Sequence, residues 1–285
     1  MNGLISLYKP PMMSSAQAVA RVRRILGVKT VGHMGTLDPM AEGVLVIGVG
    51  KSTRLFDYLI NRRKTYMAKF EFGYATDTLD ALGKTVATTS DIPSAESVLG
   101  AMRSMIGKIE QVPPEYSAKH VGGKRAYALA RNGQSVELKP STVEVYDAQL
   151  VCQPKPNETV FLIECSAGTY IRSLCRDAAK MCGSLATLTY LQRTKSGCFD
   201  VSDSISLDAL EVRGESAIIP PDFALGNMQR VDVPIELKTD LRHGRKIECD
   251  FDGDATIYCD GELYGIGRCE GGMLKLKTYL KEDAE

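Results

Sequence analysis

Alternating and helically spaced apolar residues divide the chain into short strands and amphipathic helices. Over residues 64–73 the side chains of Tyr66, Ala68, Phe70 and Phe72 fall on one face, which predicts a half-buried strand. Short apolar runs bounded by turn residues predict further strands at residues 3–8, 44–49, 143–152, 160–165 and 186–192.

The clearest helix follows Ser14 or Ser15, either of which can cap it. Val19, Val22, Ile25 and Leu26 recur at helical spacing. Gly27 is expected to end this helix. Three more helices are predicted, at 53–60 with Ser52 as its cap, at 94–106, and after Gly168, where Ile171, Leu174, Cys175 and Ala178 share one side.

The character of the sequence changes towards its C-terminus. Residues 200–225 read as a linker with short helical pieces, and from about Met228 short strands alternate with glycine turns. This pattern predicts a small all-β module of about sixty residues. We therefore expect two domains, residues 1–227 and 228–285.

Composition narrows the class of protein. The chain has 285 residues, of which 44% are hydrophobic and 25% charged, as in ordinary globular proteins. It shows no membrane-length apolar run and no evident signal peptide, so we expect a cytoplasmic protein. Its eight cysteines form no CxxC pair and histidines number three. We therefore expect reduced, buried thiols, no disulfide and no metal.

Charge is balanced overall but unevenly spread. Residues 1–65 carry ten Lys and Arg against three acids, and residues 250–285 carry nine acids against four bases. A basic lobe can follow a phosphate backbone although the whole chain is neutral. A charge cluster is more often a solvated face, so this signal alone is weak.

Residues 32–45 form the stretch most suggestive of chemistry. Three glycines and Pro39 surround Asp38 directly before the predicted strand at 44–49. Glycines permit sharp turns, and Pro39 restricts both itself and Asp38. A carboxylate on such a stiff loop suits a reacting group. The competing interpretation makes Asp38 a helix N-cap followed by Pro at N1, and taken alone the motif favours it by roughly two to one.

Two further residues have both a structural and a functional interpretation. Tyr66, at the entry of its strand, is either a core or rim aromatic or a platform for a nucleobase. Arg172 lies in the first turn of a helix, where the helix dipole disfavours a cation. It either faces solvent or pairs with a carboxylate.

Residues 113–140 read as an arm. Proline and glycine pairs bound and divide it, residues 124–131 predict a short basic helix, and Tyr116 and Tyr127 stand among the bases. Basic residues beside aromatics suit RNA contact, whereas a solvated helical hairpin would have the same composition.

The motifs together resemble those of the TruB family of tRNA pseudouridine-55 synthases over nearly the whole chain. Residues 32–45 match its GHxGxLDPxAxGxL signature, and residues 168–172 its GTYIR motif. Further matches are Lys9-Pro10 with Met13-Ser14-Ser15, the Lys64-Thr65-Tyr66 strand, the YLxR strand from Tyr190 to Arg193, and an RNA-gripping thumb around residues 116–131. The thumb departs from the family in reading YSAKH for YSALK.

The resemblance implies an isomerase that converts uridine 55 in the T loop of tRNA to pseudouridine. In this family Asp38 would be the catalytic carboxylate, with Arg172 its partner and Tyr66 stacked on the flipped uracil. His33 would fill the space that the base leaves, and Tyr170 and Leu191 would line the pocket. Lys9, Lys64, Lys124 and Arg125 are the remaining expected substrate contacts. No metal or cofactor is implied.

The predicted elements and the resemblance together give an α+β fold. We expect a mixed, mostly antiparallel sheet carrying the thumb and followed by a PUA-like module. The expected partner is the T stem-loop of tRNA, with no membrane, no obligatory protein partner and a monomeric state. Two alternatives remain open, a guide-RNA-dependent synthase and a non-catalytic tRNA chaperone.

Overall fold

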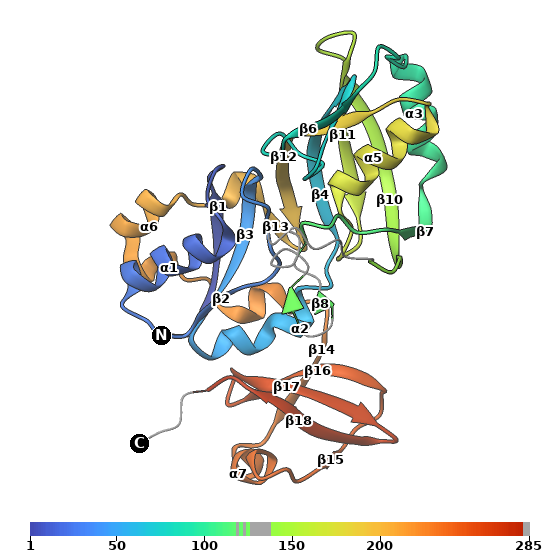
Figure 1. Ribbon diagram of the computed structural model, residues 1–285. Helices are drawn as coiled ribbons and strands as arrows, with labels where there is room; N and C mark the ends of the chain where they lie inside the picture. Colours follow the sequence, from blue (N-terminus) through green and yellow to red (C-terminus); the bar gives the residue numbers. More distant parts are fainter. Residues whose placement is uncertain (118–119, 122–123, 126–137, 282–285) are drawn as a thin grey trace.

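A computed structural model describes residues 1–117, 120–121, 124–125 and 138–281 (Figure 1). Its largest sheet has nine strands, ordered β1-β3-β12-β4-β11-β10-β7, with β2 beside β3 and β13 beside β12. These strands are β1 (Gly3–Lys9), β2 (Val31–His33), β3 (Glu42–Val49), β4 (Lys64–Phe72), β7 (Gly107–Gln111), β10 (Ser141–Cys152), β11 (Glu158–Cys165), β12 (Ala186–Ser196) and β13 (Phe199–Asp200).

Among the pairings of this sheet, only the short contact of β12 with β3 is parallel. With its helices the sheet confirms the α+β class and the mixed, mostly antiparallel arrangement. The helices are α1 (Ser15–Leu26), α2 (Phe56–Leu59), α3 (Ala95–Ser104), α5 (Ile171–Met181), α6 (Leu207–Arg213) and α7 (Lys238–Arg242). Short hairpins pair β5 (Tyr74–Thr76) with β6 (Thr85–Thr88) and β8 (His120–Val121) with β9 (Lys124–Arg125).

Alternate residues of the central strands belong to two hydrophobic clusters, which lie on opposite faces of the sheet. Leu45 and Ile47 of β3 belong to the cluster that includes residues of α1, α3, α5 and α6. Val44 and Val46 belong to a second cluster, which also contains Ile266 and Leu280 from the C-terminal part of the chain. This period-two alternation is what a sheet covered on both sides requires.

The local signals around α1 have the predicted outcome. The backbone N–H of Gln17 donates to the Ser14 hydroxyl over 3.2 Å, and the Gln17 side-chain oxygen accepts from the Ser14 backbone N–H. The two bonds form a capping box. Gly27 ends the helix with φ +65°. Ser94 likewise caps α3.

The helix predicted at 53–60 is wrong in its first half. The chain turns at Gly50 (φ +61°) directly after β3, and a 3₁₀ helix, η1 (Gly50–Leu55), precedes the short α2. Ser52 is buried inside η1 and caps nothing. The tight turn at the strand end selects the narrower helix.

Residues 229–279 form the second sheet, seen below the main body in Figure 1. Its strands are β14 (Gln229–Val233), β15 (Ile247–Glu248), β16 (Gly253–Cys259), β17 (Glu262–Glu270) and β18 (Met273–Tyr279). Val233, Ile257 and Tyr264 belong to its own hydrophobic cluster. The sheet accords with the predicted C-terminal β module.

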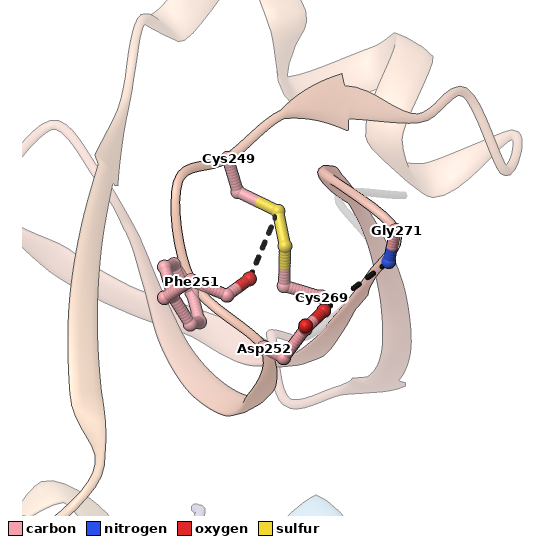
Figure 2. Close-up of a disulfide and its surroundings, with 5 residues drawn as sticks. All are labelled: Cys249, Phe251, Asp252, Cys269 and Gly271. Atoms are coloured by element: carbon pink, nitrogen blue, oxygen red, sulfur yellow. Dashed lines mark hydrogen bonds between the residues drawn. A yellow bond between two sulfur atoms is a disulfide. The ribbon is translucent and has the colours of Figure 1, made fainter.

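The expectation of no disulfide is wrong. Cys249 and Cys269 are bonded, with their Cα atoms 6.5 Å apart (Figure 2). The Cys249 N–H donates to Gly272 O over 2.9 Å, so the chain after β15 lies against the β17–β18 turn. Such a juxtaposition depends on strand order, which cysteine spacing alone does not contain.

No helix within the described ranges is long and apolar enough to cross a membrane.

Candidate active site

The loop between β2 and β3 carries Asp38. His33 is the last residue of β2, and Glu42 is the first of β3. The Ala41 N–H donates to Asp38 O over 3.1 Å, which closes a turn rather than opening a helix. The interpretation of Asp38 as a helix N-cap is therefore wrong, because the chain enters β3 before a helical turn can repeat.

Hydrogen bonds from the start of α1 and the end of β1 fix this loop. The Ser15 hydroxyl, at the start of α1, donates to Leu37 O over 3.0 Å and accepts from Leu37 N over 2.9 Å. Lys9 is fully buried at the end of β1, and its Nζ donates to Met13 O over 2.6 Å and to Pro39 O over 3.4 Å. Burial lowers the pKa of Lys9 to about 8, against the opposing pull of Asp38.

Arg172, in the first turn of α5, forms an ion pair with Asp38. Arg172 Nη2 donates to Asp38 Oδ1 over 3.0 Å, and Nε lies 2.9 Å from Oδ2. The arginine side chain is 4% exposed and the aspartate side chain 29%. The structure thus contradicts a solvent-facing Arg172, and it leaves the carboxylate accessible while its partner is covered.

Both Nη atoms of Arg172 have further acceptors. Nη1 donates to Thr78 O and Nη2 to Tyr116 O, each over 2.9 Å. Nη1 also lies 3.6 Å from Oδ2 of Asp80, which is buried in the loop between β5 and β6. A guanidinium held on four sides has little freedom to turn.

Sequence reasoning missed Asp80. In the sequence, residues 73–83 form a polar loop bounded by glycines, and the available signal is its two aspartates, Asp77 and Asp80. In the structure Asp80 Oδ1 accepts from the Thr78 hydroxyl over 2.7 Å and from Leu82 N over 3.1 Å. Its other oxygen is thereby aimed at Arg172.

Opposing effects act on the Asp38 carboxyl. Burial raises its pKa above the usual aspartate value, and the neighbouring charge of Asp80 adds to the rise. Arg172 and Lys9 oppose the increase because a nearby cation favours the ionised form. The direction that results is a raised pKa, at a position where a proton acceptor or nucleophile would operate.

Tyr66 lies close enough to Asp38 for the two groups to interact electrostatically. Its side chain is directed into the main hydrophobic cluster, which also contains Leu191, and the residue is 7% exposed. Burial raises the pKa of the Tyr66 phenol, while Arg193 lowers it. The side chain of Tyr66 is therefore a core aromatic in this structure.

Two buried cations lie behind the loop. Lys64, 5% exposed, donates from Nζ to Ile60 O over 2.5 Å and to Arg62 O over 2.6 Å. Burial, together with the nearby charge of Arg193, lowers its pKa to about 8. Arg193, noted in the sequence only as part of a strand motif, is 1% exposed and directs its donors at the loop itself.

The remaining predicted residues surround this centre. Tyr170 precedes α5, and its backbone N–H and carbonyl both bond the side chain of Gln111, over 2.8 and 3.1 Å. Burial raises the pKa of Tyr170, a hydrogen bond with Ser117 lowers it, and the charge of Asp38 raises it. His33 ends the strand that leads into the loop.

The arm at 113–140 is described only in part. Lys124 and Arg125 form β9, paired with β8, so the helix predicted at 124–131 does not begin there. The rest of that prediction, from residue 126, lies outside the described residues. Antiparallel pairing with β8 takes the place of the expected helical start.

A protein-family comparison matches residues 23–171 to the TruB family pseudouridylate synthase N-terminal domain. A tRNA pseudouridine synthase B of Thermosipho melanesiensis is 38% identical, over 99% of this chain and 100% of its own length. Those of Syntrophotalea carbinolica and Microcystis aeruginosa are 42% and 43% identical, each over 100% of this chain and 94% and 96% of their own lengths.

Solved structures share the fold at lower identity. A chain from an H/ACA RNP bound to a substrate RNA containing 2'-deoxyuridine aligns with TM-score 0.74 and 22% identity, covering 98% of this chain and 85% of that one. A chain from a Cbf5-Nop10-Gar1 complex aligns equally well, with 23% identity and the same coverage.

Proposed function

Because this chain belongs to the TruB family of pseudouridylate synthases and is a tRNA pseudouridine synthase, we propose that it isomerises uridine 55 in the T loop of tRNA. The observation that carries the site assignment is the Asp38–Arg172 pair. It combines a partly exposed carboxylate with a buried guanidinium, whose Nη atoms donate to Asp38, Thr78 and Tyr116.

The proposed reaction is an isomerisation. The N1–C1′ bond of uridine breaks, the uracil turns, and C5 bonds to C1′, while C5 loses a proton and N1 gains one. Asp38 acts in its ionised form, either as a nucleophile towards C1′ or as the base that removes a ribose proton. Arg172 keeps that carboxylate ionised and fixes its direction, because its ion pair opposes the effect of burial.

The target base has to leave its stack to reach Asp38. We propose that His33, at the end of β2, fills the vacated space, and that Tyr66 stacks on the flipped uracil. The proximity of Tyr66 to Asp38 supports this role. The phenol of Tyr66 is also suited to moving the proton released at C5. Tyr170 and Leu191 would complete the pocket.

The RNA outside the pocket needs its own contacts. We assign these to Lys124 and Arg125 in the arm and to the C-terminal sheet, which we take as a PUA-like domain spanning residues 228–285. Lys9 and Lys64 are bonded to backbone carbonyls, which supports a role in shaping the pocket rather than in direct contact. No cofactor, metal or protein partner enters the proposal, and we expect a monomer acting in the cytoplasm.

A transcribed tRNA without any modification is the direct substrate for a test. We expect stoichiometric pseudouridine at position 55, mapped by carbodiimide modification and primer extension, from the protein alone. A tRNA with cytidine at position 55 is the control and should give no product. Dependence on an added guide RNA would favour the guided alternative, and tRNA folding without any pseudouridine would favour the chaperone.

A further inference from the structure

Arg193 is among the largest fully buried side chains in the described part of the protein. Burying a cation is costly unless charge or hydrogen bonds compensate it. No ion pair joins Arg193 to an acid among the described residues, and a second buried cation, Lys64, lies near enough to interact. The compensation comes instead from backbone carbonyls.

These carbonyls lie on both sides of Asp38. Arg193 Nη2 donates to Gly35 O over 3.1 Å and Nη1 to Thr36 O over 3.4 Å, just before the aspartate. Nε donates to Val44 O over 2.7 Å, just after it. One planar guanidinium therefore holds both ends of the loop on which the carboxylate stands.

The backbone of Arg193 joins the same loop to Tyr66. Arg193 pairs with Gly43 of β3 on one side and with Tyr66 of β4 on the other. The first contact is close: a Cβ added to Gly43 (φ +98°) would lie 2.3 Å from Arg193 O. The end of the loop is thus packed directly against β12, which pairs in turn with the strand that carries Tyr66.

We propose that Arg193 is a positioning residue for the isomerisation, which sets the position of Asp38 relative to the ring of Tyr66. The proposal rests on the proposed roles of those two residues. A displacement of about 1 Å at a reacting group can cost about 100-fold in rate. A loose Gly35–Thr36 segment would produce such a displacement without weakening the grip on tRNA.

The test substitutes Arg193→Lys, which keeps the charge but lacks the fork needed to reach three carbonyls. Single-turnover tritium release from tRNA labelled at uracil C5 gives the rate, and filter binding gives Kd. We expect a fall in rate of about 100-fold, with Kd within about 2-fold of wild type. Leu210→Ala, at a fully buried residue of α6, is the stability control and should lose melting temperature while keeping its rate.

Should Arg193→Lys fail to fold, Arg193→Gln removes the buried charge, retains an amide donor and is judged by the same criteria. A rate within about 3-fold of wild type would overturn the proposal, as would a loss confined to Kd or a loss matched by Leu210→Ala. Asp38→Asn measured in parallel separates the two claims. No release by wild type refutes the proposed function, and an active Asp38→Asn refutes the role of Asp38. An inactive Asp38→Asn beside a normal Arg193→Lys refutes only the role of Arg193.

Discussion

Arg172 lies between two carboxylates, with Nε 2.9 Å from Asp38 Oδ2 and Nη1 3.6 Å from Asp80 Oδ2. Asp80 is fixed by its own hydrogen bonds from Thr78 and Leu82. The three side chains therefore act as one unit, in which Asp80 holds the guanidinium and the guanidinium holds Asp38.

The first prediction concerns Asp80→Asn. The amide keeps the acceptor for Thr78 but loses the charge that attracts Arg172, so the guanidinium can turn from Asp38. We expect kcat to fall by at least about 10-fold with tRNA binding unchanged. Asp77→Asn, in the same loop but exposed and bonded to Lys84 N, is the control. Equal rates for the two variants would exclude a role for Asp80.

The second prediction concerns the pH dependence of the reaction. Burial raises the pKa of Asp38, and the carboxyl is reactive only when ionised. The single-turnover rate should therefore decline as pH falls through a pKa above 3.8, the ordinary value. A midpoint at or below the ordinary value would contradict the description of the site.

The third prediction concerns stability and Lys64, whose pKa burial lowers from 10.5 to about 8. Below pH 8 both folded and unfolded chains hold the proton, and the cost of the buried charge is fully present. Between about pH 8 and 10.5 the unfolded chain binds more protons, so the free energy of unfolding contributed by Lys64 rises with pH.

Denaturant unfolding of wild type and Lys64→Met across this range measures that contribution. The difference between them should shift in favour of wild type by up to about 3 kcal/mol. The exposed Lys29 provides the control, since Lys29→Met should track wild type at every pH. A difference that stays constant with pH would show that Lys64 does not titrate in this window.

The fourth prediction concerns the bond between Cys249 and Cys269, which closes a loop of sequence separation 20. Cross-linking a loop of this length stabilises a fold by about 3 kcal/mol through the unfolded state. Dithiothreitol should therefore lower the unfolding midpoint of the C-terminal sheet in wild type and have no further effect on Cys249→Ser. Cys198→Ser, which removes an exposed free cysteine, should respond like wild type. An unchanged wild-type midpoint under reduction would contradict the pairing.

Strand periodicity and capping were readable from the sequence because both depend on near neighbours. The alternation from Tyr66 to Phe72 became β4, and Ser14 became the cap of α1. The proximity of Asp38 and Arg172 was expected through motif resemblance and is present in the structure. Their catalytic roles remain a prediction.

The features that the sequence did not predict depend on contacts between segments far apart in the chain. Asp80 reaches Arg172 because a loop folds back beside β12, where Ala81 N bonds Leu188 O. Arg193 meets the Asp38 loop because β12 and β3 run parallel over two residues. The Cys249–Cys269 bond depends on the β17–β18 turn. None of these pairings leaves a periodic signal along the chain.

The carboxylate of Asp38 is proposed to perform the chemistry on a bound tRNA. Single-turnover tritium release, with enzyme in excess over tRNA labelled at uracil C5, compares wild type with Asp38→Asn, and filter binding confirms that both hold tRNA equally. We predict complete release by wild type and none above background by Asp38→Asn. Release by Asp38→Asn at a rate near that of wild type would show that the reaction does not need the Asp38 carboxylate.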